Sequence, residues 1–246
     1  MTAAGPGFQT LLARVLVRPE LLRELHADPD AFAARHGADA EAARRLCRAD
    51  LGRLDLTARM TVVKRRRDAW RPFPAAASLL PELGWNHDAV RRSGVAEAVD
   101  PVRLRERLTA LAGLLAAARA TAAMAEIIRY EVLLSDLAGR RPAHQGSHPA
   151  LRPGVAVATF DMPVAKAYRR VLTGRPHTDV PAEVTHYVLR AASGQVRVRQ
   201  VSAPIRDVLA ACDGETSPER VADHLGLPRA DVIRLIDQAT EQGFLG

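Results

Sequence analysis

Apolar residues recur at helical spacing through the first part of the chain, over residues 8–61. Leu11 and Val15 belong to a stripe that repeats every three or four positions, as on the buried face of a helix. Asp28 and Pro29 mark a helix start, because Asp accepts hydrogen bonds from the first backbone amides and proline fits the first turn. The pattern predicts several short helices that pack on one another.

Prolines interrupt this pattern over residues 64–85, which we expect to form a loop that wraps over a helical core. Helical spacing resumes at Pro101 and predicts one long helix over about residues 102–138, with Leu108 on its apolar side. Residues 138–154 are rich in Gly, Pro and polar side chains, so we expect a linker there.

Patterns typical of strands follow the linker. Residues 154–160 are β-rich, and residues 165–172 predict a short helix. Residues 186–202 predict a hairpin whose turn lies at Ser193 and Gly194. The chain therefore changes from helical to mixed character at the linker.

Three helices are predicted after the hairpin. Ser217 and Pro218 form a helix-start signal, and Pro228 opens the last helix. The order β-β-α-α-α is that of a winged helix whose wing strands come first. We therefore expect an α+β fold, with a mostly helical N-terminal domain over residues 1–145 and a winged-helix-like C-terminal domain over residues 146–246.

Charge discriminates between two uses of such a domain. The whole chain has a formal net charge of +7, but residues 202–246 hold four arginines against eight acidic residues, a net charge of −4. A DNA-binding helix-turn-helix needs positive charge at its phosphate contacts, because neutralising the backbone supplies most of the affinity. The sequence therefore favours a peptide ligand. A winged-helix DNA-binding transcription regulator is the alternative, and a steep salt dependence of duplex binding would support it.

An edge strand beside an apolar helix forms a groove to which an extended peptide can add as a further strand. Here the strand would be residues 195–201 and the helix residues 228–242, and Arg197 and Arg199 would suit an acidic peptide. The other possibility is that the rest of the protein covers the strand and leaves the arginines in solvent. The predicted groove residues are Val196, Arg197, Val198, Arg199, Val232, Leu235, Ile236 and Ala239.

Residues 186–246 resemble the PqqD-like peptide-recognition domain, also called the RiPP recognition element, which serves enzymes that modify ribosomally made peptides. The matching stretches are QVRVRQVS, IRDVLAACDGETSPERVADHLGL and VIRLIDQATEQGFL, and the CDG turn and the terminal GFL are the most specific parts. The resemblance implies that the leader segment of a precursor peptide binds across the last strand and the third helix.

The middle of the chain carries a second resemblance. The stretches HPALRPGVAVATFDMPVAKAYRRVL and VPAEVTHYVLR, with the helical front half, are similar to the partner subunits of multinuclear non-heme iron oxidative enzymes in methanobactin and related peptide pathways. The resemblance implies a heterodimer with an iron-dependent oxidative enzyme that holds the iron, and no cofactor bound by this chain. The stretch DPDAFAARHGADAEAARRL is also similar to small helical modules of aromatic-ring-opening dioxygenases of the LigA type.

No set of side chains in the sequence indicates catalysis. P-loop, G-x-G-x-x-G and G-x-S-x-G motifs are absent from it. His144 and His148 stand four apart in the linker, where solvated side chains are the default reading and a metal site is the alternative. We expect neither a catalytic residue nor a metal ligand, and therefore a non-catalytic accessory protein. A ring-opening metalloenzyme is a third reading, which metal analysis of the chain alone would test.

A cluster of basic and aromatic side chains lies at residues 62–73. Three interpretations compete for it: a solvated helix end, a contact surface for the enzyme, since Arg and Trp are frequent interface anchors, and a nucleic-acid contact. In the second case residues 70–85 would form an extended arm on the enzyme. The predicted partner-contact residues are Arg66, Arg67, Trp70, Arg71, Phe73 and Trp85.

Cysteine usage and apolar segments bear on the cellular compartment. Cys47 and Cys212 are far apart in the sequence, which suits a reducing compartment. The start MTAAGPGFQT lacks the basic and apolar segments of a signal peptide. The most apolar window, residues 109–128, is interrupted by Arg119 and Glu126. We expect a cytoplasmic protein with no membrane or nucleic-acid partner.

Overall fold

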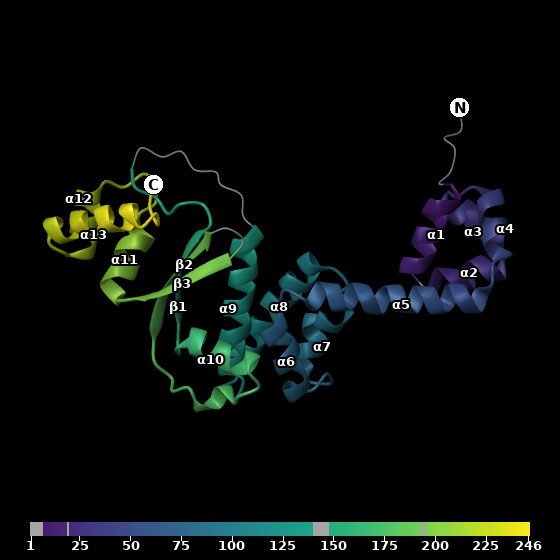
Figure 1. Ribbon diagram of the computed structural model, residues 1–246, viewed down its shortest axis with the longest axis horizontal. Helices are drawn as coiled ribbons and strands as arrows, with labels where there is room; N and C mark the ends of the chain where they lie inside the picture. The colour runs from purple at the N-terminus through teal and green to yellow at the C-terminus, as the bar shows by residue number, and fades with distance from the viewer. Residues whose placement is uncertain (1–6, 19, 140–147, 193–194) are drawn as a thin grey trace. The chain divides into compact units, whose positions relative to one another are not determined.

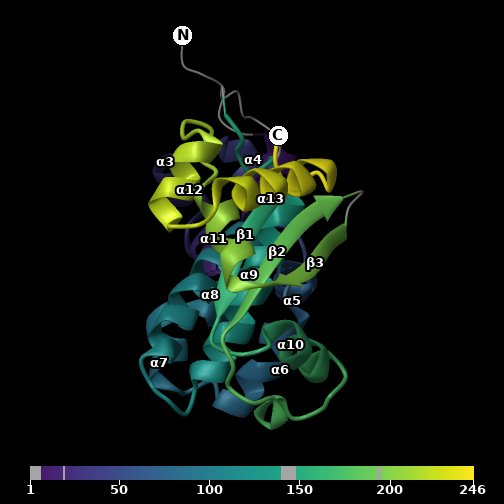
Figure 2. The same ribbon diagram turned by 90° about the vertical axis from the view of Figure 1, so that its left-hand side faces the viewer.

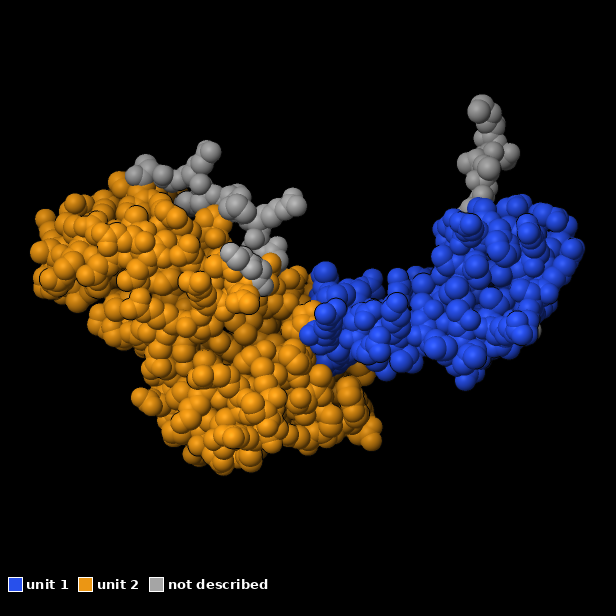
Figure 3. All heavy atoms as spheres, in the orientation of Figure 1, with its two compact units in different colours: residues 1–71, 98–103 blue, residues 72–97, 104–246 orange. Residues whose placement is uncertain are grey.

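The fold is known from a computed structural model, which describes residues 7–18, 20–139, 148–192 and 195–246. His144 and the expected turn at Ser193 and Gly194 lie outside the described residues. The described residues form thirteen α-helices and one three-stranded antiparallel sheet (Figure 1). This confirms a mostly helical α+β fold. Contacts within the chain divide it into two compact units, which are coloured separately in Figure 3.

The first unit, Met1–Arg71 with Ala98–Arg103, is a small helical assembly. Its helices are α1 (Phe8–Val17), α2 (Glu20–Ala27), α3 (Pro29–His36), α4 (Ala40–Cys47) and α5 (Leu51–Trp70). The Asp28 carboxylate accepts hydrogen bonds from the amides of Asp30 and Ala31 at 3.0 and 2.9 Å, so the predicted start of α3 is confirmed. Leu11, Leu25 and Phe32 are among the buried side chains of its core.

The second unit, Pro72–Glu97 with Leu104–Gly246, holds the sheet. Its first helical elements are α6 (Pro74–Leu83), α7 (Asp88–Ser93), the 3-10 turn η1 (Val95–Glu97), α8 (Pro101–Ala116, which begins in the first unit) and α9 (Ala122–Gly139). The remaining elements are β1 (Val155–Phe160), α10 (Val164–Leu172), η2 (His177–Asp179), β2 (Thr185–Ala192), β3 (Gln195–Val201), α11 (Ala203–Ala211), α12 (Pro218–Leu225) and α13 (Arg229–Glu241). The predicted domain boundary at residue 145 falls within this unit, because α6 and α9 pack against α10 and α9 also packs on the sheet.

The expected loop over residues 64–85 is wrong, because this stretch contains the end of α5 and all of α6. The run from Lys64 to Arg67 occupies exposed positions of α5, and Lys and Arg are good helix formers. Pro74 stands in the first turn of α6, where proline is tolerated because the backbone amide there has no intrahelical acceptor. The break between the helices is therefore confined to residues 71–73.

The single long helix expected over residues 102–138 is also wrong, because the chain leaves helical geometry between α8 and α9. The Thr121 hydroxyl donates to the carbonyl oxygens of Leu115 and Ala118 at 2.7 and 3.2 Å, and the Ala125 amide donates to the carbonyl of Thr121 at 3.0 Å. The hydroxyl thus satisfies carbonyl oxygens at and just after the end of α8 that have no helical amide partner. The two helices are thus joined by a turn that Thr121 holds.

The three strands lie in the order β1-β2-β3, and both faces of the sheet are covered. α11 packs on one face, and α9 packs on the other (Figure 2). The register places Val188 between Val157 and Arg199, and it places Leu189 between Ala156 and Val198. Because side chains alternate between faces, Arg199 points to the same face as Val188, which belongs to the core under α11 and α13.

The chain just before the sheet pairs with the C-terminus. The amides of Ala150 and Gly246 each donate to the other residue's carbonyl, at 3.1 and 3.0 Å, and the Arg152 amide donates to the Phe244 carbonyl at 2.8 Å. These bonds tie residues 148–152 to the end of α13. Among the described residues, none of the helices has both the length and the apolar character that crossing a membrane requires.

Candidate functional site

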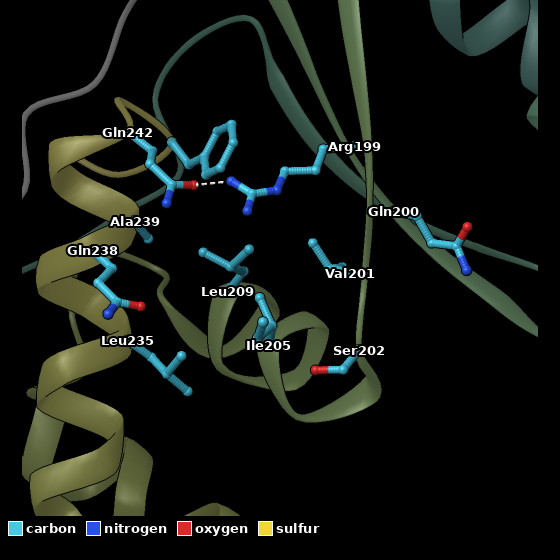
Figure 4. A pocket seen from close by; sticks show the side chains of 11 residues that line it. Arg199, Gln200, Val201, Ser202, Ile205, Leu209, Leu235, Gln238, Ala239 and Gln242 are labelled. Atoms are coloured by element: carbon cyan, nitrogen blue, oxygen red, sulfur yellow. Dashed lines mark hydrogen bonds between the residues drawn. The ribbon is translucent and has the colours of Figure 1, made fainter.

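A groove of about 570 Å³ opens between the end of β3, α11 and α13 (Figure 4). Its apolar lining comes from all three elements and from the segment after α13: Val201, Ile205, Leu209, Leu235, Ala239 and Phe244. Its polar side chains are Arg199, Ser202, Gln238 and Gln242, and Gln200 borders it with its own side chain turned away (Figure 4). The groove therefore combines an apolar floor with a hydrogen-bonding rim, as ligand sites usually do.

Arg199 spans the mouth of this groove. Its Nη1 donates to the side-chain Oε1 of Gln242 at 2.6 Å, which joins β3 to the end of α13 (Figure 4). Arg190 on β2 donates from its Nη1 to the main-chain carbonyl of the same Gln242, also at 2.6 Å. Two arginines of the hairpin thus fix the end of the helix that forms one wall of the groove.

The structure brings three of the eight predicted groove residues together in this lining: Arg199, Leu235 and Ala239. Val232 and Ile236 are instead buried in the core beneath α13.

The other three predicted groove residues, Val196, Arg197 and Val198, lie elsewhere on β3. Val196 and Val198 alternate with the arginines and point to the opposite face of the sheet, toward α9. Arg197 is exposed on the groove side of the strand, two residues before Arg199.

Sequence reasoning missed the part of the lining that α11 and the chain end provide. Ile205 and Leu209 stand four residues apart on α11 and so face the same way, and this spacing was the available signal. Gln238 and Gln242 are likewise four residues apart, at the end of α13, and so face the same way. Phe244 reaches the groove only because the chain turns back after Gly243, which has a φ of 70°.

β3 stands at the edge of the sheet. It pairs with β2 over seven residues, and its other side has no strand partner among the described residues. Its main-chain amides and carbonyls on that side are available in the way that strand addition requires. The groove lies at one end of this free edge.

The CDGETS turn between α11 and α12 is held by Asp213. Its carboxylate accepts from the amides of Glu215 and Thr216, both at 2.8 Å, and from the Thr216 hydroxyl at 3.0 Å. These hydrogen bonds, the amide of Glu215 first, lower the pKa of Asp213. Cys212 beside it is buried in the core, and burial raises the pKa of its thiol to about 11. A thiol with that pKa is a packing group and not a nucleophile at neutral pH.

The predicted partner-contact residues do not form the extended arm that was expected. Phe73 is only 1% exposed and belongs to the interior of the protein, so it is not available to a partner. Trp85 is 50% exposed and follows α6, and Trp70 is half-buried at the end of α5. Arg66, Arg67 and Arg71 are exposed at the end of α5.

Within the described parts of the chain, no group of three or more His, Cys, Asp or Glu side chains has the arrangement of a metal site. His148 is half-buried, and its backbone amide donates to the Gly214 carbonyl at 3.2 Å.

Sequence reasoning also missed Glu131, a buried carboxylate on α9. It is 1% exposed and accepts hydrogen bonds from the amides of Ala75 and Ala76, at 2.7 and 2.8 Å, in the first turn of α6. Burial raises the pKa of Glu131 to about 7, although these amides and the Tyr168 hydroxyl act in the opposite direction. Ile127 and Ile128 stand four and three residues before Glu131 and are buried. Their spacing from Glu131 was a sequence signal that its carboxylate lies on the interior face of the helix.

An aromatic cluster lies beside Glu131, on the face of the sheet away from the groove. The ring centroid of Tyr130 is 5.7 Å from that of Phe160, 5.3 Å from that of Tyr168 and 6.4 Å from that of Tyr187. Burial raises the pKa of Tyr130 to about 12. The cluster is therefore neutral at physiological pH and packs α9 against β1, β2 and α10.

Comparison with protein-family models gave no match for the chain, and comparison with curated proteins gave none either.

Proposed function

We propose that this chain is a non-catalytic partner in the maturation of a ribosomally made peptide. The region from β2 to α13 forms a winged-helix-like domain that acts as a RiPP recognition element. It binds the leader segment of the precursor. The helical front half docks on an iron-dependent oxidative enzyme, to which the iron belongs. The single observation that carries this proposal is the groove beside the free edge of β3.

Three properties of the groove support a peptide as the ligand. The free edge of β3 offers main-chain hydrogen bonds to an extended segment. The apolar floor, which includes Ile205 and Leu235, accepts alternate side chains of that segment. Arg197 and Arg199 place positive charge at the strand and so favour an acidic peptide.

Holding the leader in this way would raise the local concentration of the precursor at the enzyme's active site. The enzyme then needs little affinity of its own for the residue that it modifies. A protein without catalytic groups can therefore increase the rate of the modification.

Ion pairs on α13 argue against the alternative of a DNA-binding regulator. Arg229 forms a two-pronged pair with Asp223, with shortest distances of 2.9 Å, and Arg234 pairs with Asp231 at 2.7 Å. The two cations that α13 would present to DNA are thus already neutralised by acidic neighbours. Phosphate binding would have to displace these pairs in a region of net charge −4.

The test is titration of a labelled leader peptide, taken from a precursor encoded beside the gene, with the full chain, followed by fluorescence anisotropy at physiological salt. We expect saturable binding that is micromolar or tighter and a duplex DNA control that does not bind. Reversing the strand charges with Arg197→Glu and Arg199→Glu should weaken binding. The matched variant Arg119→Glu with Arg220→Glu changes charge by the same amount at exposed sites outside the groove and should bind normally.

The same titration is repeated with the enzyme present. Absence of leader binding both with and without the enzyme would overturn the proposal. Equal affinity of the two double variants would remove its electrostatic part.

A further inference from the structure

Three large apolar side chains stand in solvent along one face of α5. Leu56, Met60 and Val63 are 59, 64 and 67% exposed. Their spacing of four and then three residues places them in one line along the helix, over about two turns. Isolated exposed apolar residues are common on protein surfaces, but an aligned group on one helix marks an interaction site.

The opposite face of α5 is the one that packs within the first unit. Ala58 is fully buried there, and Leu54 is half-buried against the same core, which includes Leu11 and Val15 of α1. α5 is thus apolar on both sides, with one side used by the fold. The stripe of Leu56, Met60 and Val63 has no role in the core of this unit.

Basic residues lie at both ends of the stripe. Arg53 precedes Leu56 by three residues, Lys64 follows Met60 by four, and Arg67 follows Val63 by four, so helical geometry places all three cations on the stripe's face. The acidic Asp55 is turned to a flank, where it pairs with Arg59 at 2.6 Å. At the N-terminal end of the stripe, Arg53 pairs with the Asp50 carboxylate at 3.5 Å. The face is therefore apolar in the middle and most positive at its C-terminal end, at Lys64 and Arg67.

We infer that the outer face of α5, formed by Leu56, Met60 and Val63 with Arg53, Lys64 and Arg67, docks an amphipathic helix of a partner protein that carries acidic residues beside its apolar side chains. A stripe two turns long matches the anchors that such a helix presents at every third or fourth position. Lys64 and Arg67 supply most of the complementary charge and set the direction of the partner helix.

The same charges disfavour the other occupants. A second copy of α5 packed antiparallel about Met60 would set Arg53 opposite Arg67. Its nearest carboxylates, Asp50 and Asp55, are already paired with Arg53 and Arg59, so a second copy offers Lys64 and Arg67 no acidic partner. A helix that lies on a membrane uses a broad apolar face with aromatic residues, whereas this stripe has three side chains and none is aromatic. Nucleic acid would use the cations and leave the apolar stripe without contacts.

This inference does not rest on the peptide groove, because α5 belongs to the first unit and the groove to the second. The probe is a fluorescein-labelled helical peptide with leucines at helical spacing and glutamates beside them, titrated with the full chain. We expect binding that Met60→Asp weakens by at least about tenfold, and that Lys64→Glu with Arg67→Glu weakens similarly. Met60→Gln keeps the helix neutral and well formed and should weaken binding by a smaller factor.

Two variants serve as matched controls. Val184→Asp puts the same change at an apolar residue that is 59% exposed and outside α5, and it should bind the probe normally. Arg197→Glu with Arg199→Glu should also bind normally, which separates this surface from the groove. Circular dichroism of each variant verifies that the helices are intact.

Several outcomes would overturn the inference. The inference fails if a probe with lysines in place of the glutamates binds as tightly as the acidic probe. It also fails if both Met60 variants bind the acidic probe as tightly as the unmodified chain. A dimer in sedimentation that Met60→Asp disperses would assign the face to a second copy. Binding to phosphatidylserine-containing vesicles that Met60→Asp abolishes, without binding of the peptide, would assign it to a membrane surface.

Discussion

Arg190 on β2 reaches the end of α13, where its Nη1 donates to the carbonyl oxygen of Gln242 at 2.6 Å. Glycine at the next position leaves room for this contact. Gly243 has a φ of 70°, and a Cβ there would lie 2.8 Å from Nη1 of Arg190. The cation also neutralises the negative end of the helix dipole. Together with Arg199, which donates to the Gln242 side chain, Arg190 thereby holds the hairpin and the last helix at the spacing that the groove needs.

Replacing Gly243 with alanine should destabilise the second unit. The left-handed backbone conformation costs a non-glycine residue about 1–2 kcal/mol, and the new Cβ would also displace the Arg190 guanidinium. We expect a lower urea midpoint by circular dichroism and weaker leader binding, because the wall of the groove would no longer be fixed.

Two other glycines separate these causes. Gly226 also has a positive φ, of 64°, but its added Cβ would meet nothing within 4 Å. Gly226→Ala should therefore lower the free energy of unfolding only through the strained backbone conformation. Gly113 lies in open space within α8, and Gly113→Ala should stabilise the helix by about 0.5–1 kcal/mol. If Gly243→Ala and Gly226→Ala lose equal stability, the contact with Arg190 contributes nothing.

Glu131 should make stability depend on pH near neutrality. Its pKa rises from 4.5 to about 7 on burial, so the folded chain keeps a proton that the unfolded chain has lost between these values. Unfolding therefore releases a proton in this window, and the free energy of unfolding falls as pH rises from about 4.5 to 7, by on the order of 3 kcal/mol in total.

Glu131→Gln should flatten this dependence, as measured by urea denaturation at a series of pH values. The control is Glu82→Gln, which changes an exposed carboxylate on neighbouring α6 and should leave the slope unchanged. A slope that Glu131→Gln does not alter would assign the pH dependence to other groups.

Gln242 should tune the charge at the groove. Gln242→Glu would convert its hydrogen bond with Arg199 into an ion pair and withdraw that arginine from the ligand. We expect weaker binding of an acidic leader in the anisotropy titration. Gln238→Glu adds the same charge to the groove lining without a bond to Arg199, and it should have a smaller effect. Equal losses from both variants would mean that Arg199 does not select for acidic residues.

Asp213 should stabilise the turn before α12 only while it is ionised. Its pKa is lowered by the hydrogen bonds from Glu215 and Thr216, so the contribution is fully present above the ordinary value of 3.8 and is lost as pH falls through the lowered value. Asp213→Asn should lower the thermal midpoint at neutral pH. The difference from the unmodified chain should shrink under strongly acidic conditions, and a constant difference would contradict this role.

The elements that carry strong local signals could be predicted from the sequence. Asp28 with Pro29 and Ser217 with Pro218 start helices as expected, and the alternation from Val196 to Arg199 forms β3. Residues close together in the sequence determine where these helices and this strand begin. The fold class and the pairing of the hairpin followed from such signals.

Other features depend on contacts between distant parts of the chain. The basic run of α5 contains no helix breaker, but its charge and the prolines beyond it suggested a loop. For the site, Arg199 of β3 and Leu235 of α13 line one groove, whereas the turn-back at Gly243 that brings in Phe244 has no periodic pattern in the sequence. The valines of β3 face α9, which covers that side of the sheet. The alternation in the sequence does not reveal which face of the strand a distant helix covers.

The aromatic layer on the far side of the sheet gives the protein a built-in optical reporter. All three tyrosines of the chain belong to it, while the two tryptophans, Trp70 and Trp85, stand at the end of α5 and after α6. A strand added to β3 should alter the near-ultraviolet signal of the tyrosines, and a helix docked on α5 should alter that of Trp70, which lies on the same helix. Two binding events on one unlabelled chain can thus be read in two separate spectral bands.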